Sequence, residues 1–429
     1  MNIFQALGSD ILEYIVAGKR PNTYSEEIRK FSVTLQYYSP KAYMYVREKF
    51  NDILPHPRTL SRWYMAIDGQ PGFTKESFDT LADIAKTKEI QCNLVIDEMS
   101  IRKQIEMDSN RNVYGFVNLG ITSTENVDKN ILEAKNALVF ILVGINGYWK
   151  LPIGYFLIDG LSGKDRASLL LKALQLINET GVNINSLTFD GASVNTSMVS
   201  TLGADLNNSP QIINPHTKEP IYIFLDAAHM IKLVRNAWGD RVYKKNENNK
   251  SVEVIKELVN SKEELIRWDY LKKLYTIESE KGLRVGTKLT IRHIEYSNEK
   301  MNVRLAAQTL SKSVADALMF LKTNESYFKD VDATVQFIQY MNNAFDILNS
   351  RNQFSINPYN KPISIDTVNT YRQFTIEFTQ YVEGLMFVEY RNEQRIVTKV
   401  LNSNRKTGFI GMIIDLKNAI SLFEFIIKK

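Results

Sequence analysis

The sequence predicts a mixed α/β domain that is preceded by a helical region and followed by a long helical segment. Strand-like apolar runs occupy the stretch from residue 89 to 225, whereas helical periodicity dominates on either side of it. Three of the strand-like runs end in an aspartate, at Asp97, Asp190 and Asp226. We therefore expect a helical region at 1–85, a sheet domain at 86–238 and a helical segment at 239–429.

The composition is that of a folded protein that has no membrane span and no cysteine-based site. With 429 residues, of which 44% are hydrophobic, the chain can bury the cores of two or three domains. No window has the roughly eighteen uninterrupted apolar residues of a membrane helix, and no signal-peptide pattern opens the chain, so we expect a soluble intracellular protein. Cys92 is the single cysteine and the four histidines are dispersed, which leaves carboxylates as the expected ligands of any metal. The net charge of +5 permits an anionic partner without requiring one.

Three helices joined by short loops are expected in the first 80 residues. The first, at 25–38, opens with a serine cap followed by two glutamates, which suit a helix N-terminus. The second, at 40–50, has apolar residues at spacings of three and four. The third, at 57–67, begins with a proline, which is favoured in the first helical turn.

The third helix carries polar and basic residues of the kind that contact DNA. Arg58 and Arg62 lie on one side, with Ser61 close by, and a helix-turn-helix presents such a surface to a DNA groove. The alternative is a packed helical lobe in which Trp63 and Tyr64 belong to the core and no DNA is bound.

The order of strands and helices from residue 89 onward indicates a particular sheet. Strands are expected at 93–97, 113–119 and 137–145, with a further strand at 149–158 across an Asn-Gly turn. Helices and strands then alternate, at 165–178, 186–189, 194–202, 222–225 and 229–238. The order β-β-β-α-β-α-β-α is that of the RNase H-like fold, in which the first strand lies beside the fourth. Asp97 and Asp190 are thereby predicted to stand together.

Two carboxylates at the ends of neighbouring strands are suited to divalent cations. Mg²⁺, or Mn²⁺ in its place, prefers oxygen ligands, and two such ions can activate an attacking hydroxyl and stabilise the leaving oxygen of a phosphoryl transfer. The alternative for a strand-end aspartate is a turn residue or a helix cap, and Asp190 followed by Gly191 also fits a turn. The pair in this strand order makes a metal site as good an interpretation as a turn.

Five longer strings are specific enough to suggest a family. They are IDEMSIRK (96–103), TFDGAS (188–193), LDAAHMIKLVRNAW (225–238), KMNVRLAAQTLSKSVADAL (300–318) and FDILNSRN (345–352). These strings resemble P-element-type DNA transposases, including the animal homologues that carry an N-terminal THAP zinc finger. The resemblance extends over nearly all of residues 24–425.

The resemblance implies a fold, a reaction and a set of partners. In that family an RNase H-like domain with two catalytic aspartates and a glutamate is interrupted by a GTP-binding insertion, and the resemblance puts the aspartates at Asp97 and Asp190. It implies two-metal DNA cleavage and strand transfer in the nucleus, with GTP as a cofactor, transposon ends as the DNA partner and a homo-oligomer that holds two ends. Asp226 is a third acid near the site. His229 and Lys232, three residues apart on the next helix, either face one another or brace the domain junction.

The helical segment after residue 244 is expected to be the insertion. No GxxxxGK[ST] string occurs, so no conventional phosphate loop is expected. Asp346 and Asn349 are predicted to bind the guanine and ribose, because a carboxylate accepts from the guanine donors while an amide both donates and accepts. Lys300 is predicted to contact phosphate. The alternative is a pair of neighbouring helix residues that bind no ligand.

Two features depart from the family pattern. Residues 1–23 lack the cysteines of a THAP finger, and no DHxE-type string with the catalytic glutamate occurs; Asp415 and Glu424 lie outside that pattern. We therefore expect a transposase or transposase-derived protein whose catalysis is impaired by the loss of the third acid. The alternatives are a domesticated DNA- or nucleotide-binding protein without catalysis, and an unrelated metal-dependent nuclease or GTPase, which the resemblance disfavours.

Overall fold

The computed structural model describes most of the chain and divides it into two compact units, Met1–Gln70 and Pro71–Lys429. The described residues are 23–64, 69–107, 113–120, 132–240, 242–245, 251–254, 256–282, 287–391 and 394–428. None of the helices in these ranges is long and apolar enough to cross a bilayer.

Three helices occur among the described residues of the first unit, and the first two have serine caps. They are α3 (Glu26–Tyr38), α4 (Pro40–Lys49) and α5 (Pro57–Tyr64). The Ser39 hydroxyl accepts a hydrogen bond from the Ala42 amide at 3.1 Å, which satisfies one of the free donors at the start of α4. The helices enclose a small apolar core in which Tyr43 is buried and donates its hydroxyl to the Pro55 carbonyl at 2.5 Å. The predicted extension of the third helix to residue 67 lies outside the described residues.

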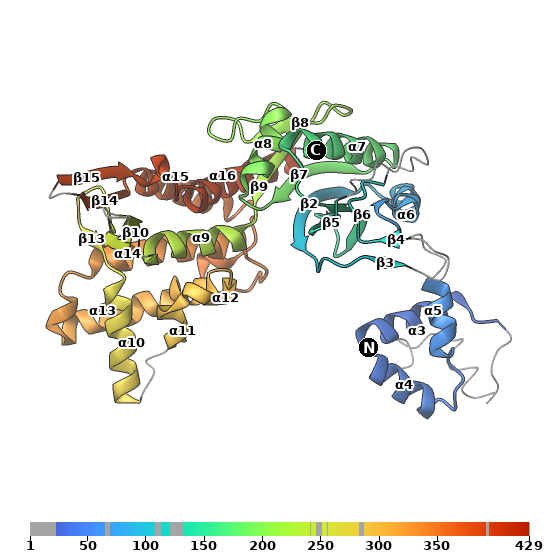
Figure 1. The fold of residues 1–429 in the computed structure, drawn as a ribbon, viewed down its shortest axis with the longest axis horizontal. Helices are drawn as coiled ribbons and strands as arrows, with labels where there is room; N and C mark the ends of the chain where they lie inside the picture. Colours follow the sequence, from blue (N-terminus) through green and yellow to red (C-terminus); the bar gives the residue numbers. More distant parts are fainter. Residues whose placement is uncertain are drawn as a thin grey trace. The chain divides into compact units, whose positions relative to one another are not determined.

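A seven-stranded mixed sheet forms the centre of the second unit, in the order β1-β6-β5-β2-β7-β9-β8. Its strands are β1 (Gly72–Phe73), β2 (Gln91–Ser100), β5 (Asn136–Gly144), β6 (Lys150–Ile158), β7 (Asn183–Phe189), β8 (Gln211–Ile213) and β9 (Pro220–Leu225). Strand β2 pairs antiparallel with β5 and parallel with β7, so the first long strand lies beside the strand that follows the first crossover helix (Figure 1). The predicted RNase H-like sheet is thus confirmed.

The predicted strand at 113–119 is only partly present. Its first residues form β4 (Val113–Tyr114), which pairs with β3 (Glu106–Met107) in a separate two-stranded sheet, and Asn118 makes a single antiparallel bridge to Leu157 of β6 in the main sheet. Gly115, at φ +106°, interrupts the extended run immediately after β4, and Val113 is exposed and packs on no core. The next long strand of the main sheet after β2 is therefore β5, whose alternate residues are buried.

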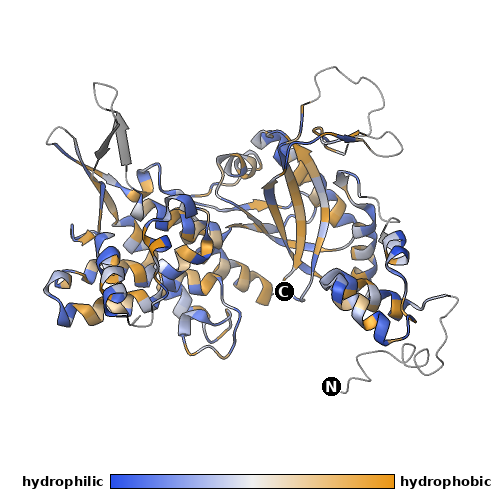
Figure 2. Ribbon diagram, turned by 60° about the horizontal axis from the view of Figure 1, so that its bottom comes forward, coloured by the Kyte–Doolittle hydropathy of each residue, from blue (hydrophilic) through white to orange (hydrophobic). Residues whose placement is uncertain are grey.

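Helices cover one face of the sheet and leave the other face partly open. They are α6 (Lys75–Ala85), α7 (Gly163–Glu179) and α8 (Ser193–Thr201), and α9 (Ala227–Gly239) follows the strand β9. Along β2, Leu94 and Ile96 are buried whereas Val95 is half-buried and Asp97 is exposed. Because successive side chains of a strand point to opposite faces, the odd-numbered positions of β2 define the open face. The apolar character of the central strands is visible in Figure 2.

The remainder of the second unit is mainly helical and also contains strands. The helices are α10 (Asp269–Lys281), α11 (Ile291–Ile294), α12 (Val303–Thr309), α13 (Lys312–Asn324), α14 (Asp332–Leu348), α15 (Val368–Glu383) and α16 (Thr407–Ile427). The four-stranded antiparallel sheet β13-β12-β14-β15 consists of β12 (Lys256–Val259), β13 (Leu265–Ile266), β14 (Met386–Arg391) and β15 (Gln394–Lys399), and β10 (Val242–Lys245) pairs with β11 (Ser251–Val254). Sequence periodicity did not predict these strands.

The last helix, α16, returns to the main sheet. It packs against β9 and α9. The Asn418 amide donates to the carbonyl oxygens of Pro210 and Ile223, each at 2.7 Å, so α16 is hydrogen-bonded to the edge of the sheet. A Cβ on Gly408 would stand 2.9 Å from the Met230 carbonyl oxygen, which shows why glycine is needed where α16 crosses α9. The segment expected to form one helical insertion thus ends in a helix that belongs with the sheet.

Candidate active site

The register of β2 and β7 places Asp97 and Asp190 at the same level on neighbouring parallel strands. Val95 pairs with Thr188, and each acid lies two residues further along its strand direction. The period of two puts Asp97 on the face of Val95 and Asp190 on the face of Thr188, both on the open side of the sheet. Neighbouring strands are about 4.8 Å apart, so the two carboxylates emerge close together.

A third aspartate continues this line on the next strand. Phe189 pairs with Leu225 in the parallel pair β7 and β9. Asp190 and Asp226 are the next residues of the two strands, so they lie at the same level along the sheet. Asp226 caps α9: one of its oxygens accepts from the Ala228 amide at 2.9 Å and the other lies 2.6 Å from His229 Nδ1. Burial acts to raise the pKa of Asp226, but the hydrogen bonds and the charges of His229 and Lys232 outweigh it, and the pKa is lowered. Both oxygens of Asp226 are therefore already engaged.

Asp97 and Asp190, by contrast, each keep one oxygen free. The Glu98 amide donates to Asp97 Oδ1 at 2.9 Å, whereas Asp190 Oδ1 accepts from the Ala192 amide at 3.0 Å and from the Asn195 side chain at 2.7 Å. The Oδ2 atom of each carboxylate has no hydrogen-bond partner among the described residues. These two oxygens are free to bind a hard cation, which prefers oxygen ligands.

Lys232, on α9, is buried and within electrostatic range of the three acids. Burial is the largest influence on its ammonium and lowers its pKa, while the charges of Asp226, Asp190 and Asp97 act in the opposite direction. All three carboxylates therefore act on one cationic group, and one ammonium leaves them with an excess of negative charge. The site is thus electrostatically suited to a divalent cation, although no group of three His, Cys, Asp or Glu side chains arranged to hold a metal occurs within the described ranges.

A buried arginine connects the two predicted catalytic strands. Arg166, on α7, forms an ion pair with Glu98 on β2 and donates to Asn195 Oδ1 on α8 at 2.9 Å. Asn195 in turn donates to Asp190, so the chain Glu98–Arg166–Asn195–Asp190 fixes the orientation of one predicted ligand. Sequence reasoning missed Arg166 and Asn195. The helical periodicity could have identified Arg166, because it occupies the apolar stripe of α7, in which the other residues are buried.

A cavity of about 870 Å³ lies on the open face of the sheet, and of the three acids Asp226 lines it. Its floor contains a polar row in which Asn93 Oδ1 accepts from the hydroxyls of Ser186 and Thr188, at 3.0 and 3.1 Å. Its walls include Asp226, the segment 347–351 after α14, and the apolar side of α16. Thr188 and Asp190 are two residues apart on one strand face, so the floor of the cavity lies about 7 Å from the acid.

Asp415, on α16, is a buried carboxyl in the wall of this cavity. Its Oδ1 accepts from the Leu225 amide at 2.7 Å, and its Oδ2 has no partner among the described residues. Burial raises the pKa of Asp415 well above its usual value, and the nearby charge of Asp226 adds to the effect.

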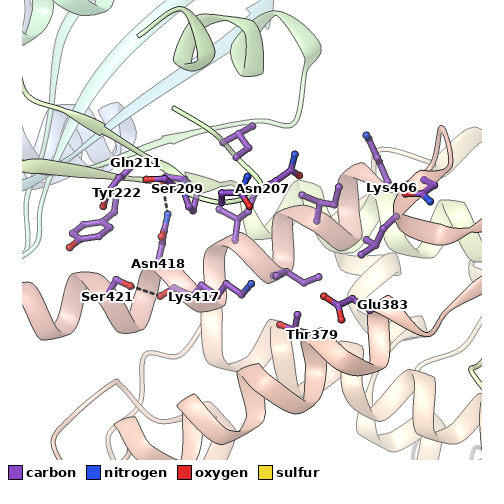
Figure 3. A pocket seen from close by; sticks show the side chains of 18 residues that line it. Asn207, Ser209, Gln211, Tyr222, Thr379, Glu383, Lys406, Lys417, Asn418 and Ser421 are labelled. Atoms are coloured by element: carbon purple, nitrogen blue, oxygen red, sulfur yellow. Dashed lines mark hydrogen bonds between the residues drawn. The ribbon is translucent and has the colours of Figure 1, made fainter. Parts of the chain in front are cut away.

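A separate cavity of about 710 Å³ lies between the β8–β9 edge and helices α15 and α16 (Figure 3). Asn418 reaches from α16 toward the strands, and the Ser421 hydroxyl donates to the Lys417 carbonyl at 3.1 Å. None of the predicted site residues lines this cavity.

The structure gives two of the predicted nucleotide-binding residues other partners. Asp346 Oδ2 accepts from the amides of Asn342 and Asn357, each at 2.8 Å, and burial raises the pKa of Asp346. Asn349 is exposed, follows the end of α14 and lines the large cavity. The hydrogen bonds of the described residues do not join Lys300 to Asp346 or Asn349. The Lys300 ammonium instead donates to Asp240 at 3.0 Å.

Arg58, Ser61 and Arg62 are all exposed on α5. They are separated by three and four residues and therefore share one side of the helix. Trp63 is half-buried against the small core, where the Arg29 guanidinium lies 4.6 Å from the centre of its ring. The helix thus combines a packed side with an exposed polar and basic side.

Three family models match successive parts of the chain. Residues 1–63 match "Transposable element P transposase-like, HTH domain", residues 69–203 match "TNP-like, RNase H N-terminal domain", and residues 228–362 match "TNP-like, GTP-binding insertion domain". The chain belongs to the family of P-element-type transposases. The resemblance seen in the sequence is therefore confirmed.

Two curated members of the P-element-type family are similar along most of the chain. The human protein "DNA transposase THAP9" is 25% identical over 431 residues, which cover 98% of this chain and 45% of that protein. The Drosophila melanogaster "Transposable element P transposase" is 24% identical over 358 residues, covering 81% of this chain and 42% of that protein. The chain thus spans less than half the length of these relatives.

A solved structure shares the fold. The "Drosophila P element transposase strand transfer complex" superposes with a TM-score of 0.71 at 19% sequence identity, covering 100% of this chain and 85% of that chain.

Proposed function

We propose that this chain contributes Asp97 and Asp190 to a metal-dependent site for phosphoryl transfer on DNA. The observation that carries the proposal is the β2–β7 register, which brings the two acids to one level on the open face of the sheet. Membership in the P-element-type transposase family supports DNA cleavage and strand transfer as the reaction. The nucleus as its location, transposon ends as its substrate and a homo-oligomer as the acting form belong to the same proposal.

Asp97 and Asp190 would hold Mg²⁺ or Mn²⁺ through their free oxygens. When bound, the metal would polarise the phosphate and activate the attacking oxygen. The protein's own residues hold the ligands in place: Arg166 and Asn195 orient the Asp190 carboxylate, and the two strands keep the acids at one level. Lys232 offsets part of the negative charge that the acids would otherwise concentrate on the open face.

We further propose that the insertion binds a guanine nucleotide through Asp346 and Asn349. The match to a GTP-binding insertion domain supports this assignment. The Asn342 and Asn357 amides that donate to Asp346 occupy the acceptor positions a guanine edge would use, so nucleotide binding requires at least one of them to move. Lys300 would contact phosphate only after leaving Asp240.

DNA binding is proposed for the exposed side of α5, through Arg58, Ser61 and Arg62. The match of residues 1–63 to a helix-turn-helix domain supports it. Two arginines on one exposed helix side supply the phosphate contacts, and the hydroxyl adds a hydrogen-bond donor.

Binding of DNA or nucleotide without catalysis is the second candidate. The observation that favours it is that the described residues bring no third free carboxylate to Asp97 and Asp190, since both oxygens of Asp226 are engaged. A strand-transfer assay on the purified chain separates the two candidates. We expect little or no strand transfer from this chain alone. Robust excision or joining of a transposon substrate would show that catalysis is not impaired.

Calorimetric titration with Mn²⁺ tests the metal site. Asp97→Asn and Asp190→Asn are each expected to weaken binding at least about tenfold, because even the outer-shell partners of metal ligands contribute ten- to hundredfold. Asp269→Asn is the matched control, since Asp269 pairs with Lys272 on the exposed surface of α10. Unchanged Mn²⁺ binding in both site variants would refute the proposed site.

A further inference from the structure

The loop between α14 and α15 carries two apolar side chains that pack on nothing. Phe354 is 89% exposed and Ile356 is 100% exposed. These side chains gain no burial from folding, and loops held by a rigid scaffold often carry binding residues.

Hydrogen bonds brace the loop at its base and at its tip. The Asn357 amide donates to Asp346 on α14 at 2.8 Å, and the Tyr371 hydroxyl donates to the carbonyls of Pro358 and Lys361. At the tip, the Asn352 side chain accepts from the Phe354 amide at 3.0 Å. The exposed side chains are therefore presented by a supported loop, which reduces the conformational entropy that a ligand would have to remove.

The position of the loop connects it to the candidate active site. Asn349 and Arg351, at the start of the loop, line the large cavity together with Thr188 and Asp226. Three residues span at most about 11 Å, so Phe354 lies within that reach of Arg351 at the cavity wall. The loop therefore begins at a wall of the cavity that also contains Asp226.

The charge of the segment indicates the chemistry of its partner. From Ile347 to Ile365 the sequence contains no acidic residue, and its only charged side chains are Arg351 and Lys361. The same stretch contains several asparagines and a glutamine, which are neutral donors and acceptors. Cationic and amide groups around an exposed phenyl ring match a polyanion with stacking faces, which describes nucleic acid with unpaired bases.

We propose that Phe354 and Ile356 form a wedge that stacks against an unpaired base of the DNA strand entering the site, with Arg351 holding the adjacent phosphate. The phenyl ring provides the stacking face and Ile356 fills the space beside it. This inference rests on the proposed function, because it assigns an unpaired strand to the same cavity and the same acids.

Fluorescence binding to two DNA probes tests the wedge. One probe is a duplex with a single-stranded extension that carries a fluorescent adenine analogue at its first unpaired position, and the other is the blunt duplex of the same sequence. Phe354→Ala is expected to weaken binding to the extended probe at least about fivefold, the lower end of one base–aromatic stack, and to leave the blunt duplex unchanged. The quenching of the analogue by wild-type protein is expected to disappear in Phe354→Ala and to persist in Phe354→Tyr.

Ile365→Ala is the matched control. Ile365 is also an exposed isoleucine of this connection, at 76%, but it lies outside the braced tip, and its substitution is expected to change neither affinity nor quenching. Arg351→Ala is expected to weaken both probes and to reduce the slope of log affinity against log salt by about one unit.

Equal affinities of wild type and Phe354→Ala for both probes would overturn the proposal. A change in sedimentation of Phe354→Ala with unchanged DNA binding would also overturn it, and would assign the tip to a protein contact. The Mn²⁺ titration distinguishes this failure from failure of the proposed function, because the loop variants are expected to keep the cation affinity that Asp97→Asn and Asp190→Asn lose.

Discussion

Replacement of Arg166 by methionine tests the link between the fold and the candidate site. The Arg166 side chain is 4% exposed and that of its partner Glu98 is 26% exposed. Removing one partner of a buried ion pair leaves an uncompensated charge and costs about 3–5 kcal/mol. Glu98 keeps the Asn136 amide donor and some contact with water, which puts the expected loss near the lower end, at about 3 kcal/mol.

Urea unfolding followed by circular dichroism measures this loss. With a slope of about 3 kcal/mol per molar, the midpoint of Arg166→Met is expected about 1 M below that of wild type. The control is Lys312→Met, which breaks an ion pair with Asp316 whose side chains are 67% and 56% exposed, and which is expected to change stability by less than about 1 kcal/mol.

The same variant has a second readout at the metal site. Without Arg166, Asn195 loses the donor that holds its side-chain oxygen, and the Asp190 carboxylate loses its fixed orientation. Folded Arg166→Met is therefore expected to bind Mn²⁺ about ten- to hundredfold more weakly. An unfolding midpoint equal to that of wild type, or full Mn²⁺ affinity in the folded variant, would refute the reasoning.

Two further predictions concern Asp415 and the first unit. The carboxyl of Asp415 has a raised pKa in the folded protein. Above about pH 3.9 the carboxyl therefore ionises in the unfolded chain while it stays protonated in the folded protein. The stability of wild type is thus expected to fall as pH rises toward the folded pKa. Asp415→Asn keeps an oxygen that accepts from the Leu225 amide but cannot ionise. In urea unfolding at a series of pH values, the free energy of unfolding of this variant minus that of wild type is expected to grow as pH rises across that window. A difference that stays constant with pH would contradict the burial of Asp415. Combined Arg58→Ala and Arg62→Ala is expected to weaken DNA binding about equally across sequences and to reduce the salt slope by about two units, whereas a sequence-dependent loss would indicate base contacts instead.

The pairing of Asp97 with Asp190 was predictable because it follows from local patterns and one topological rule. Each acid ends a short apolar run, and the order of strands and helices puts those two strands side by side. The run at 113–119 has a strand-like composition but does not form one continuous strand, because Gly115 at a positive φ interrupts it and only Asn118 bridges the main sheet. A periodicity argument cannot detect such an interruption, since glycine is compatible with both conformations.

Alternation and helical periodicity in the sequence determined the sheet domain, the helical first unit and the positions of the acids, since these depend on residues close together in the chain. Only the tertiary structure decided that α16 returns to β9, that Asp415 is buried against Leu225, and that Arg166 joins Glu98 to Asn195. The hydrogen bonds and ion pairs that make these contacts join residues between 29 and 195 positions apart. Contacts over such separations depend on how complete elements pack, and no local pattern encodes that.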